Sequence, residues 1–196
     1  MKKLIEIAGV LPVSEVNGPG KRSVIWVQGC PKRCPGCWNP EFLAFGSDWK
    51  LTPKELVEYV RKGTHSFSDI EGITFSGGEP FSQAAALAEA AKIFRRLGLS
   101  VISYSGWTLE DIRLTKDGSK LLKQLDILID GEYIRSLATT RRWRSSSNQR
   151  VHFLTERYSH YRSKIETDEQ EFEITLQSGG VTITGFPDQS VLRVLR

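Results

Sequence analysis

The chain has 196 residues, of which 39% are apolar and 26% charged, a composition typical of a folded globular protein and not of a disordered one. Its 27 basic and 23 acidic residues give a formal net charge of +4, which permits an anionic ligand or partner but does not demand nucleic acid. No apolar run approaches the length of a membrane span, and Glu6 interrupts the short apolar start, so we expect a cytoplasmic protein without a signal peptide.

Two strands and a cysteine cluster make up the first part of the chain. Residues 3–10 and 23–28 have the composition of β-strands. The three cysteines, Cys30, Cys34 and Cys37, follow the second strand within a span of eight residues. An odd number of cysteines packed so closely is a poor disulfide framework, but it is a good set of metal ligands.

Strand-like and helix-like segments alternate after the cysteines. Thr52, Pro53 and Glu55 predict a helix start with a capping box, and Gly63 predicts the end of that helix. Further strands are predicted over residues 72–76, 100–104 and 126–130, and helices over residues 82–97, 108–114 and 119–125. This alternation predicts an α/β fold with a parallel sheet and right-handed crossovers.

The last third of the chain changes character. Residues 135–150 are basic, polar and turn-like, whereas residues 172–176 and 181–184 flank a Gln-Ser-Gly-Gly turn and predict a β-hairpin. We therefore expect a core domain over residues 1–165 and a C-terminal β-hairpin extension over residues 166–196.

Unusual residues follow several of the predicted strands. Gly77, Gly78 and Glu79 come after one strand, and Ser105 and Asp130 lie at the ends of the next two. In parallel α/β sheets, ligands bind at the C-terminal ends of the strands. We expect these residues and the cysteines to converge on one edge of the sheet.

The number of cysteines restricts the kind of metal centre. A structural zinc site needs four ligands, and so does a ferredoxin-type cluster. The histidines His65, His152 and His160 are distant in the sequence and lack zinc-finger spacing. Three thiolates without a fourth favour a [4Fe–4S] cluster with one iron open to a small molecule. A zinc-binding nucleic-acid module, with the basic stretch 141–144 as its contact surface, is an alternative of a different class, although the modest net charge argues against nucleic acid.

The cysteine spacing resembles a known motif. The pattern Cys30-x3-Cys34-x2-Cys37 is that of the radical S-adenosylmethionine (SAM) superfamily. The longer stretch 18–40, with Gly36 before the third cysteine, is similar to one branch of it, the activating enzymes of anaerobic ribonucleotide reductase.

Three later stretches extend the resemblance. Residues 76–80, Ser-Gly-Gly-Glu-Pro, resemble a SAM-binding motif, and residues 126–133 and 144–150 resemble late motifs of the same branch. The resemblance covers about residues 14–155, which is most of the core domain.

This resemblance implies a partial (β/α) barrel of the radical SAM type, with one side open for a protein substrate. Cys30, Cys34 and Cys37 would ligate a [4Fe–4S] cluster whose open iron binds SAM. The reduced cluster would pass one electron to SAM and release methionine and a 5′-deoxyadenosyl radical. No catalytic residue beyond the cluster and SAM is implied.

The resemblance also implies a set of SAM-binding residues near the strand ends: Trp38, Gly77, Gly78, Glu79, Ser105 and Asp130. Gly77 and Gly78 would let the backbone approach the methionine part of SAM. Glu79 would bind its ammonium group, and Trp38 would pack on its adenine.

The partners follow from the same branch. The radical would abstract hydrogen from a backbone glycine of a glycyl radical enzyme, anaerobic ribonucleotide reductase, with reduced flavodoxin or ferredoxin as the electron donor. Independently of the resemblance, we expect Arg22, Lys32 and Arg33 to surround the cluster loop, either as solvated surface charges or as residues that tune the charge of the cluster or guide an electron donor. A radical SAM enzyme acting on a small molecule or nucleotide is the alternative with the same cofactors.

Overall fold

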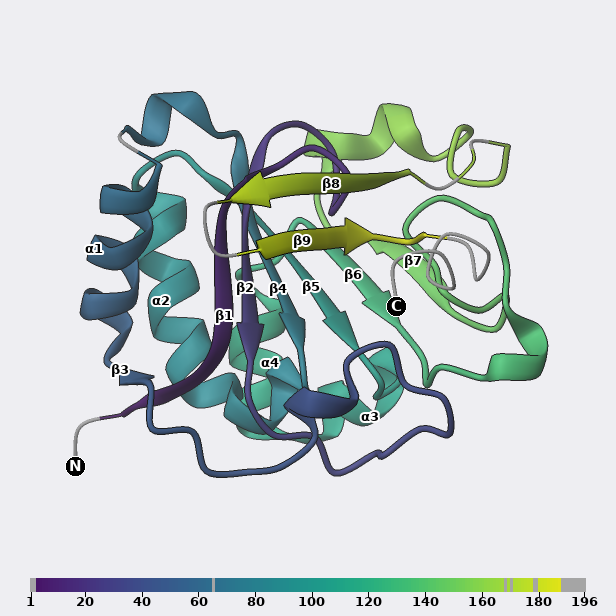
Figure 1. The fold of residues 1–196 in the computed structure, drawn as a ribbon, viewed down its shortest axis with the longest axis horizontal. Coiled ribbons are helices and arrows are strands. Elements are labelled where there is room, and N and C mark those ends of the chain that lie inside the picture. Colours follow the sequence, from purple (N-terminus) through teal and green to yellow (C-terminus); the bar gives the residue numbers. More distant parts are fainter. Residues whose placement is uncertain (1–2, 65, 168, 170, 178–179, 188–196) are drawn as a thin grey trace.

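The computed structural model describes residues 3–64, 66–167, 169, 171–177 and 180–187. A seven-stranded sheet lies at its centre, in the order β3-β1-β2-β4-β5-β6-β7 (Figure 1). The strands are β1 Ile5–Ser14, β2 Arg22–Val27, β3 Lys50–Leu51, β4 Gly72–Gly77, β5 Ser100–Ser105, β6 Ile127–Asp130 and β7 Arg150–Phe153.

The direction of the strands divides the sheet into a centre and two edges. Strands β2, β4, β5 and β6 run parallel, which confirms an α/β fold with parallel strands. The sheet as a whole is mixed, because β1, β3 and β7 pair antiparallel with their neighbours. The short link 15–21 between β1 and β2 explains one case, since a parallel crossover needs about a dozen residues or more.

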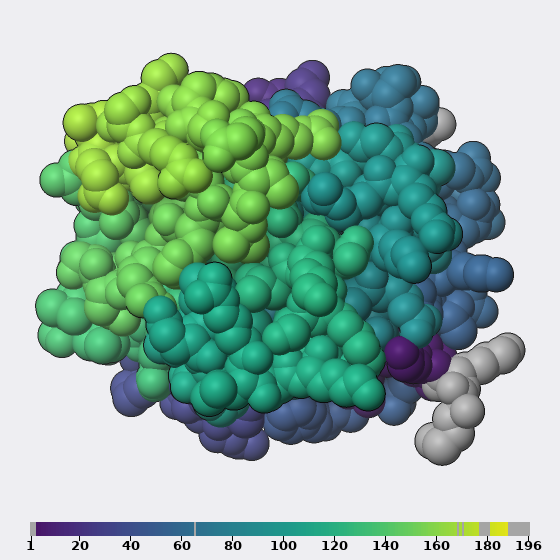
Figure 2. Space-filling view, turned by 180° about the vertical axis from the view of Figure 1, so that it is seen from behind, coloured from purple at the N-terminus to yellow at the C-terminus, as the bar shows by residue number. Residues whose placement is uncertain are grey.

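Helices cover one face of the sheet (Figure 1). They are α1 Pro53–Gly63, α2 Ala84–Arg96, α3 Leu109–Leu114 and α4 Lys116–Leu122. Figure 2 shows the molecule from behind, where the teal atoms of the segment that contains α2 to α4 lie over this face. Short 3-10 turns join these elements: η1 Pro40–Phe42, η2 Phe67–Asp69, η3 Pro80–Gln83, η4 Arg135–Leu137 and η5 Glu156–Tyr161.

Capping residues fix where the helices begin. In α1, the Thr52 hydroxyl accepts from the Glu55 amide at 3.3 Å, and the Glu55 carboxylate accepts from the Thr52 amide at 2.7 Å, which confirms the predicted capping box. Helix α4 begins three residues before the predicted residue 119, because Thr115 caps it by accepting from the Gly118 amide. Helix α2 begins two residues late, because η3 occupies the residues before it.

Apolar side chains lie on both faces of the sheet. Phe75, Leu87 and Phe94 belong to the main core between the sheet and the helices. Ile102 and Ile127, which neighbour core residues in their strands but point to the other face, pack in a second cluster. The remaining buried members of that cluster are Ile129, Trp143, Tyr158 and Ile165.

The predicted C-terminal hairpin is confirmed. It consists of β8 Phe172–Gln177 and β9 Gly180–Gly185, which pair antiparallel. Figure 1 shows the hairpin crossing the sheet on the face opposite to the helices. The Asn17 amide fixes it to the link between β1 and β2 by donating to the Thr184 hydroxyl at 2.8 Å.

A fully buried arginine joins the N-terminal ends of the parallel strands. Arg22, at the start of β2, donates from Nε to the Thr74 hydroxyl at 2.9 Å and from Nη1 to the Ser100 hydroxyl at 2.9 Å. Nη2 donates to the Ile73 carbonyl at 2.7 Å. The expectation that Arg22 lies beside the cysteine loop is therefore wrong, since it lies at the opposite end of β2.

We expect Arg22→Ala to lower the free energy of unfolding by about 3–5 kcal/mol, because it empties a buried space and leaves buried oxygens without donors. Urea unfolding would measure the loss. Arg61→Ala, which removes an exposed arginine paired with Glu58 on α1, is the matched control and should change stability little. Equal losses for the two variants would contradict this view of Arg22.

Candidate cluster and cofactor site

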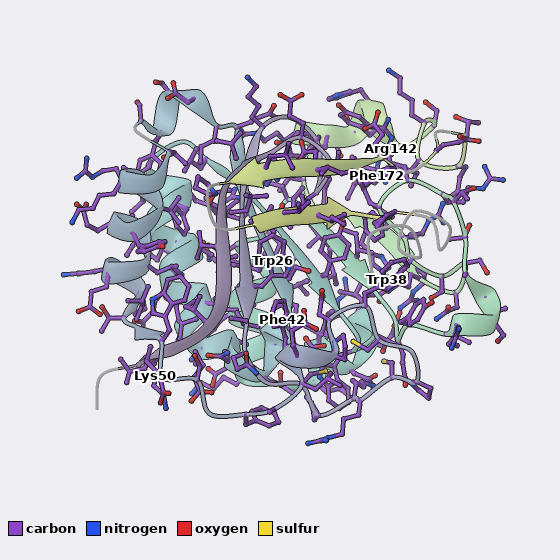
Figure 3. The ribbon with its side chains drawn as sticks, viewed as in Figure 1. Trp26, Trp38, Phe42, Lys50, Arg142 and Phe172 are labelled. Carbon is purple, nitrogen blue, oxygen red and sulfur yellow. The ribbon has the colours of Figure 1, made fainter. Side chains whose placement is uncertain are left out.

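A cavity of about 580 Å³ lies between the sheet and β9, at the C-terminal ends of the parallel strands. Its volume is within the range of about 300–1,000 Å³ that is typical of small-molecule sites. Figure 3 shows three of its aromatic lining residues, Trp26, Trp38 and Phe42, on the side of the sheet where β9 runs. The predicted site residues that line it are Cys30, Cys34, Cys37, Trp38, Gly77, Gly78, Glu79 and Ser105. The expected convergence at one sheet edge thus holds, and it includes Asp130, which pairs in register with Ser105 but does not line the cavity.

The cysteine loop leaves β2 and turns back under the cavity. Cys30 is buried, and Cys34 and Cys37 are half-buried, all three as free thiols. The Cys37 amide donates to the Cys34 carbonyl at 3.1 Å. Arg33 and Gly36 both have positive φ values, 52° and 77°, so the loop makes two left-handed turns between the cysteines.

The donor set fits an iron–sulfur cluster. Burial raises the pKa of the Cys34 thiol to about 11 and also raises that of Cys37, so a bound cation has to displace their protons. The described Cys, His, Asp and Glu side chains contain no group of three or more placed to hold one metal ion. A four-iron cluster does not need such a group, because each thiolate binds a different iron.

Two glycines bring the end of β4 against the cysteine loop. Gly77 has a φ of +102°, and a Cβ there would lie 2.6 Å from the Val27 nitrogen. A Cβ on Gly78 would lie 2.4 Å from the Gly29 carbonyl oxygen. The nearest atoms belong to the protein's own backbone, so these residues must be glycine for the two strand ends to meet. The predicted approach to SAM is a separate matter, and it stays a prediction.

Glu79 is buried and organises the ends of two strands. Its carboxylate accepts from the Phe81 amide at 2.9 Å, the Ser105 hydroxyl at 2.9 Å and the Gly106 amide at 2.7 Å. Burial raises the pKa of Glu79 to about 7, although these hydrogen bonds and the charge of Lys32 lower it. A carboxylate has about four acceptor sites, so Glu79 keeps capacity for one further donor in the cavity.

Two buried polar atoms in the cavity wall lack partners. Trp38 Nε1 and the Tyr104 hydroxyl make no hydrogen bond to any described residue. Burying a polar atom without a partner costs free energy, so both atoms are suited to a ligand that carries polar groups and a flat ring. Tyr104 is a residue that sequence reasoning missed, because its place next to Ser105 at the end of β5 was its only signal.

Asp130 ends β6, as predicted, but its side chain points away from the cavity lining. It is fully buried outside the cavity lining, and its carboxylate accepts from the Leu109 amide at 2.5 Å and from Arg150 at 2.6 and 3.0 Å. Burial would raise the pKa of Asp130, but His152, Arg150 and the Leu109 amide outweigh it and lower the pKa to about 2. Asp130 therefore joins β6, β7 and the start of α3, and its contact with a cofactor stays a prediction.

Long-range packing supplies the other residues that the sequence did not reveal. Residues 182–187, from β9 and just beyond it, line the cavity. No local pattern in the sequence marks these contacts. Lys32, which the sequence predicts near the cluster, also lines the cavity, with its ammonium 3.9 Å from the centre of the Trp107 ring.

Comparison with known proteins places the chain among iron–sulfur enzymes. A family model described as "4Fe-4S single cluster domain" matches residues 16–152. The cysteine loop and this match define a radical SAM enzyme with a [4Fe–4S] cluster and SAM as its cofactors. The zinc-module alternative is thereby wrong. No helix of the described chain is both long and apolar enough to cross a membrane.

The chain belongs to the family of anaerobic ribonucleoside-triphosphate reductase-activating proteins. It is 33% identical over 156 residues to the protein of that name from Enterobacteria phage T4, which covers 72% of this chain and 90% of that protein. The relatives from Escherichia coli K12 and Vibrio cholerae are 28% and 29% identical, over 73% and 74% of this chain and 95% of theirs. Among solved structures, QueE from Escherichia coli gives a TM-score of 0.44 at 14% identity, over 63% of this chain and 68% of that one.

We expect Gly77→Ala to destabilise the protein far more than Gly98→Ala. Both glycines have positive φ values, but a Cβ on Gly98 meets no atom within 4 Å. Gly98→Ala should therefore cost only the backbone strain, about 1–2 kcal/mol, whereas Gly77→Ala adds a clash with β2 and should also reduce the iron bound after anaerobic reconstitution. Urea unfolding and iron analysis measure both effects, and equal results for the two variants would count against the close contact.

We expect the stability of the cluster-free chain to fall as the pH rises from about 4.5 to about 7. The raised pKa of Glu79 means that the folded state holds a proton that the unfolded state has released in this range. The contribution of Glu79 is on the order of 3 kcal/mol. In Glu79→Gln this part of the pH dependence should vanish, and an unchanged slope of unfolding free energy against pH would refute the assignment.

Proposed function

We propose that this chain cleaves SAM reductively and generates a glycyl radical on an anaerobic ribonucleotide reductase. The observation that carries the proposal is that three free cysteines and the buried Glu79 line one cavity. The names of the relatives support the choice of partner.

The cysteines and Glu79 would bind different groups, the cluster and SAM. Cys30, Cys34 and Cys37 would hold a cluster that, once reduced, supplies one electron to the sulfonium of SAM and so yields the radical that takes hydrogen from glycine. Glu79 would accept from the ammonium group of SAM with its remaining acceptor site. Trp38 and Tyr104, with their unpaired polar atoms, would bind and orient the nucleoside.

Ser105 and Asp130 contribute mainly through their neighbours. The Ser105 hydroxyl donates to Glu79 and accepts from the Trp107 amide at 3.0 Å, so it holds the carboxylate in place. Asp130 fixes the first turn of α3, which follows the strand end that carries Ser105. We propose both as positioning residues for the cofactor site.

The fold supports the same function. We propose that the sheet with helices on one face is a partial barrel of the radical SAM type, formed by residues 1–165, and that residues 166–196 are the hairpin extension across its open side. Arg33 is exposed on the cysteine loop, and a cation there suits an acidic electron donor such as reduced flavodoxin or ferredoxin. With these partners, we propose that the chain acts in the cytoplasm.

A radical assay tests the proposal. The protein is reconstituted with iron and sulfide without oxygen, reduced, and mixed with SAM and the anaerobic ribonucleotide reductase of the same organism. We expect a glycyl radical signal in electron paramagnetic resonance, and methionine and 5′-deoxyadenosine as products. Cys34→Ser should bind less than half of the wild-type iron and give no signal above a sample without SAM.

The reaction products distinguish two ways in which the proposed function can fail. SAM cleavage without a glycyl radical would reject the partner and leave a small molecule or nucleotide as the substrate. A reconstituted protein that contains about four irons per chain but leaves SAM intact would reject the whole proposal.

A further inference from the structure

Strand β9 presents an unpaired edge. The Phe186 amide donates to the Glu171 carbonyl at 3.1 Å, so Glu171 and Phe186 form a hydrogen-bonded pair of the hairpin. Hydrogen-bonded and non-hydrogen-bonded pairs alternate along an antiparallel ladder, so Ile174 and Ile183 form a non-hydrogen-bonded pair. The backbone N–H and C=O groups of Val181 and Ile183 therefore point away from β8. Within the described chain, the hairpin is a sheet of two strands, so no further strand pairs with this edge.

The unpaired edge of β9 faces the cavity. Residues 182–187 line the cavity consecutively, whereas no described residue of β8 lines it. Successive side chains of a strand point to opposite faces, so a strand that faces a cavity with one face would contribute every second residue. Consecutive residues from one strand alone indicate that the cavity meets β9 along its edge.

The position of this edge is fixed by contacts on both sides. Asn17 donates to the Thr184 hydroxyl at 2.8 Å, and the Glu15 amide donates to the Glu173 carboxylate at 2.7 Å. At the end of β9, the Phe186 ring lies 6.2 Å from the Tyr104 ring, between centroids. The edge is thus held over the cavity before any ligand arrives.

We propose that an extended, glycine-containing segment of the partner polypeptide binds as an added strand along the free edge of β9. This inference rests on the proposed function, because only a polypeptide substrate can bind in this way. Strand addition gives affinity through main-chain hydrogen bonds and tolerates varied side chains. In an added strand, every second residue points to the same face. A glycine at such a position exposes its Cα hydrogens, because it has no side chain to cover them.

A proline pair tests the edge. Ile183→Pro removes an amide donor that the hairpin does not use, and Ile174→Pro removes the equivalent donor on the outer edge of β8, away from the cavity. We expect Ile183→Pro to raise the partner concentration for half-maximal glycyl radical formation at least about fivefold, the effect of one lost hydrogen bond. Each rate is divided by the SAM cleavage of the same variant without partner, and Ile174→Pro should match the wild type. Equal shifts in the two variants would overturn the proposal.

Amide hydrogen exchange on the wild-type protein tests the same edge without a substitution. Addition of the reductase should slow exchange at the Val181 and Ile183 amides and leave Ile174 and Leu176 unchanged. Protection on β8 alone, or on neither strand, would overturn the proposal, and so would protection that grows with the protein's own concentration, which would show pairing with a second copy. A wild-type protein that forms no glycyl radical identifies a failure of the proposed function instead.

Discussion

The close contact between the ends of β2 and β4 is the constraint on which the site depends. Gly78 donates to the Val27 carbonyl at 2.8 Å, and Glu79 donates to the Gly29 carbonyl at 2.9 Å. Gly77 and Gly78 have no room for a Cβ at this contact. On the β2 side of this contact the chain continues to Cys30, and on the β4 side it continues to Glu79. The contact therefore fixes the position of the cysteine loop relative to the Glu79 carboxylate.

Glu79 extends this constraint to the next strand. Its hydrogen bonds to Ser105 and Gly106 join the ends of β4 and β5, and its burial has a cost that appears as the raised pKa. A buried carboxylate that keeps one free acceptor site supports the proposed binding of the ammonium group of SAM.

Local patterns in the sequence predicted most of the central elements, because capping boxes, glycine stops and apolar periodicity act within a few residues. The cysteines and the residues from Gly77 to Glu79 were found by their resemblance to family motifs and by their place after predicted strands, and all of them line the cavity. Sequence reasoning failed where partners are distant in the sequence. The sequence predicts Arg22 beside the cysteine loop, yet Arg22 is buried at the other end of β2, where its donors are satisfied by Thr74, Ser100 and the Ile73 carbonyl. Strand β7 was missed because its polar sequence is held at the sheet edge by pairing with β6, where Arg150 meets Asp130.

The N-terminal and C-terminal ends of the parallel strands differ in how their polar groups are paired. Arg22 joins the N-terminal ends with donors that are paired inside the protein, whereas the C-terminal ends carry thiols, a buried carboxylate and, within the described chain, two polar atoms without a partner. Paired groups at one end of the sheet thus leave the groups at the other end available for a ligand. The hairpin shows the same division on a smaller scale, because Asn17 and Tyr104 hold it in place while the amides of Val181 and Ile183 pair with no strand of the described chain. Free hydrogen-bonding groups of the sheet and of the hairpin thus adjoin one cavity, which suits the two ligands that we propose, a cofactor and a polypeptide.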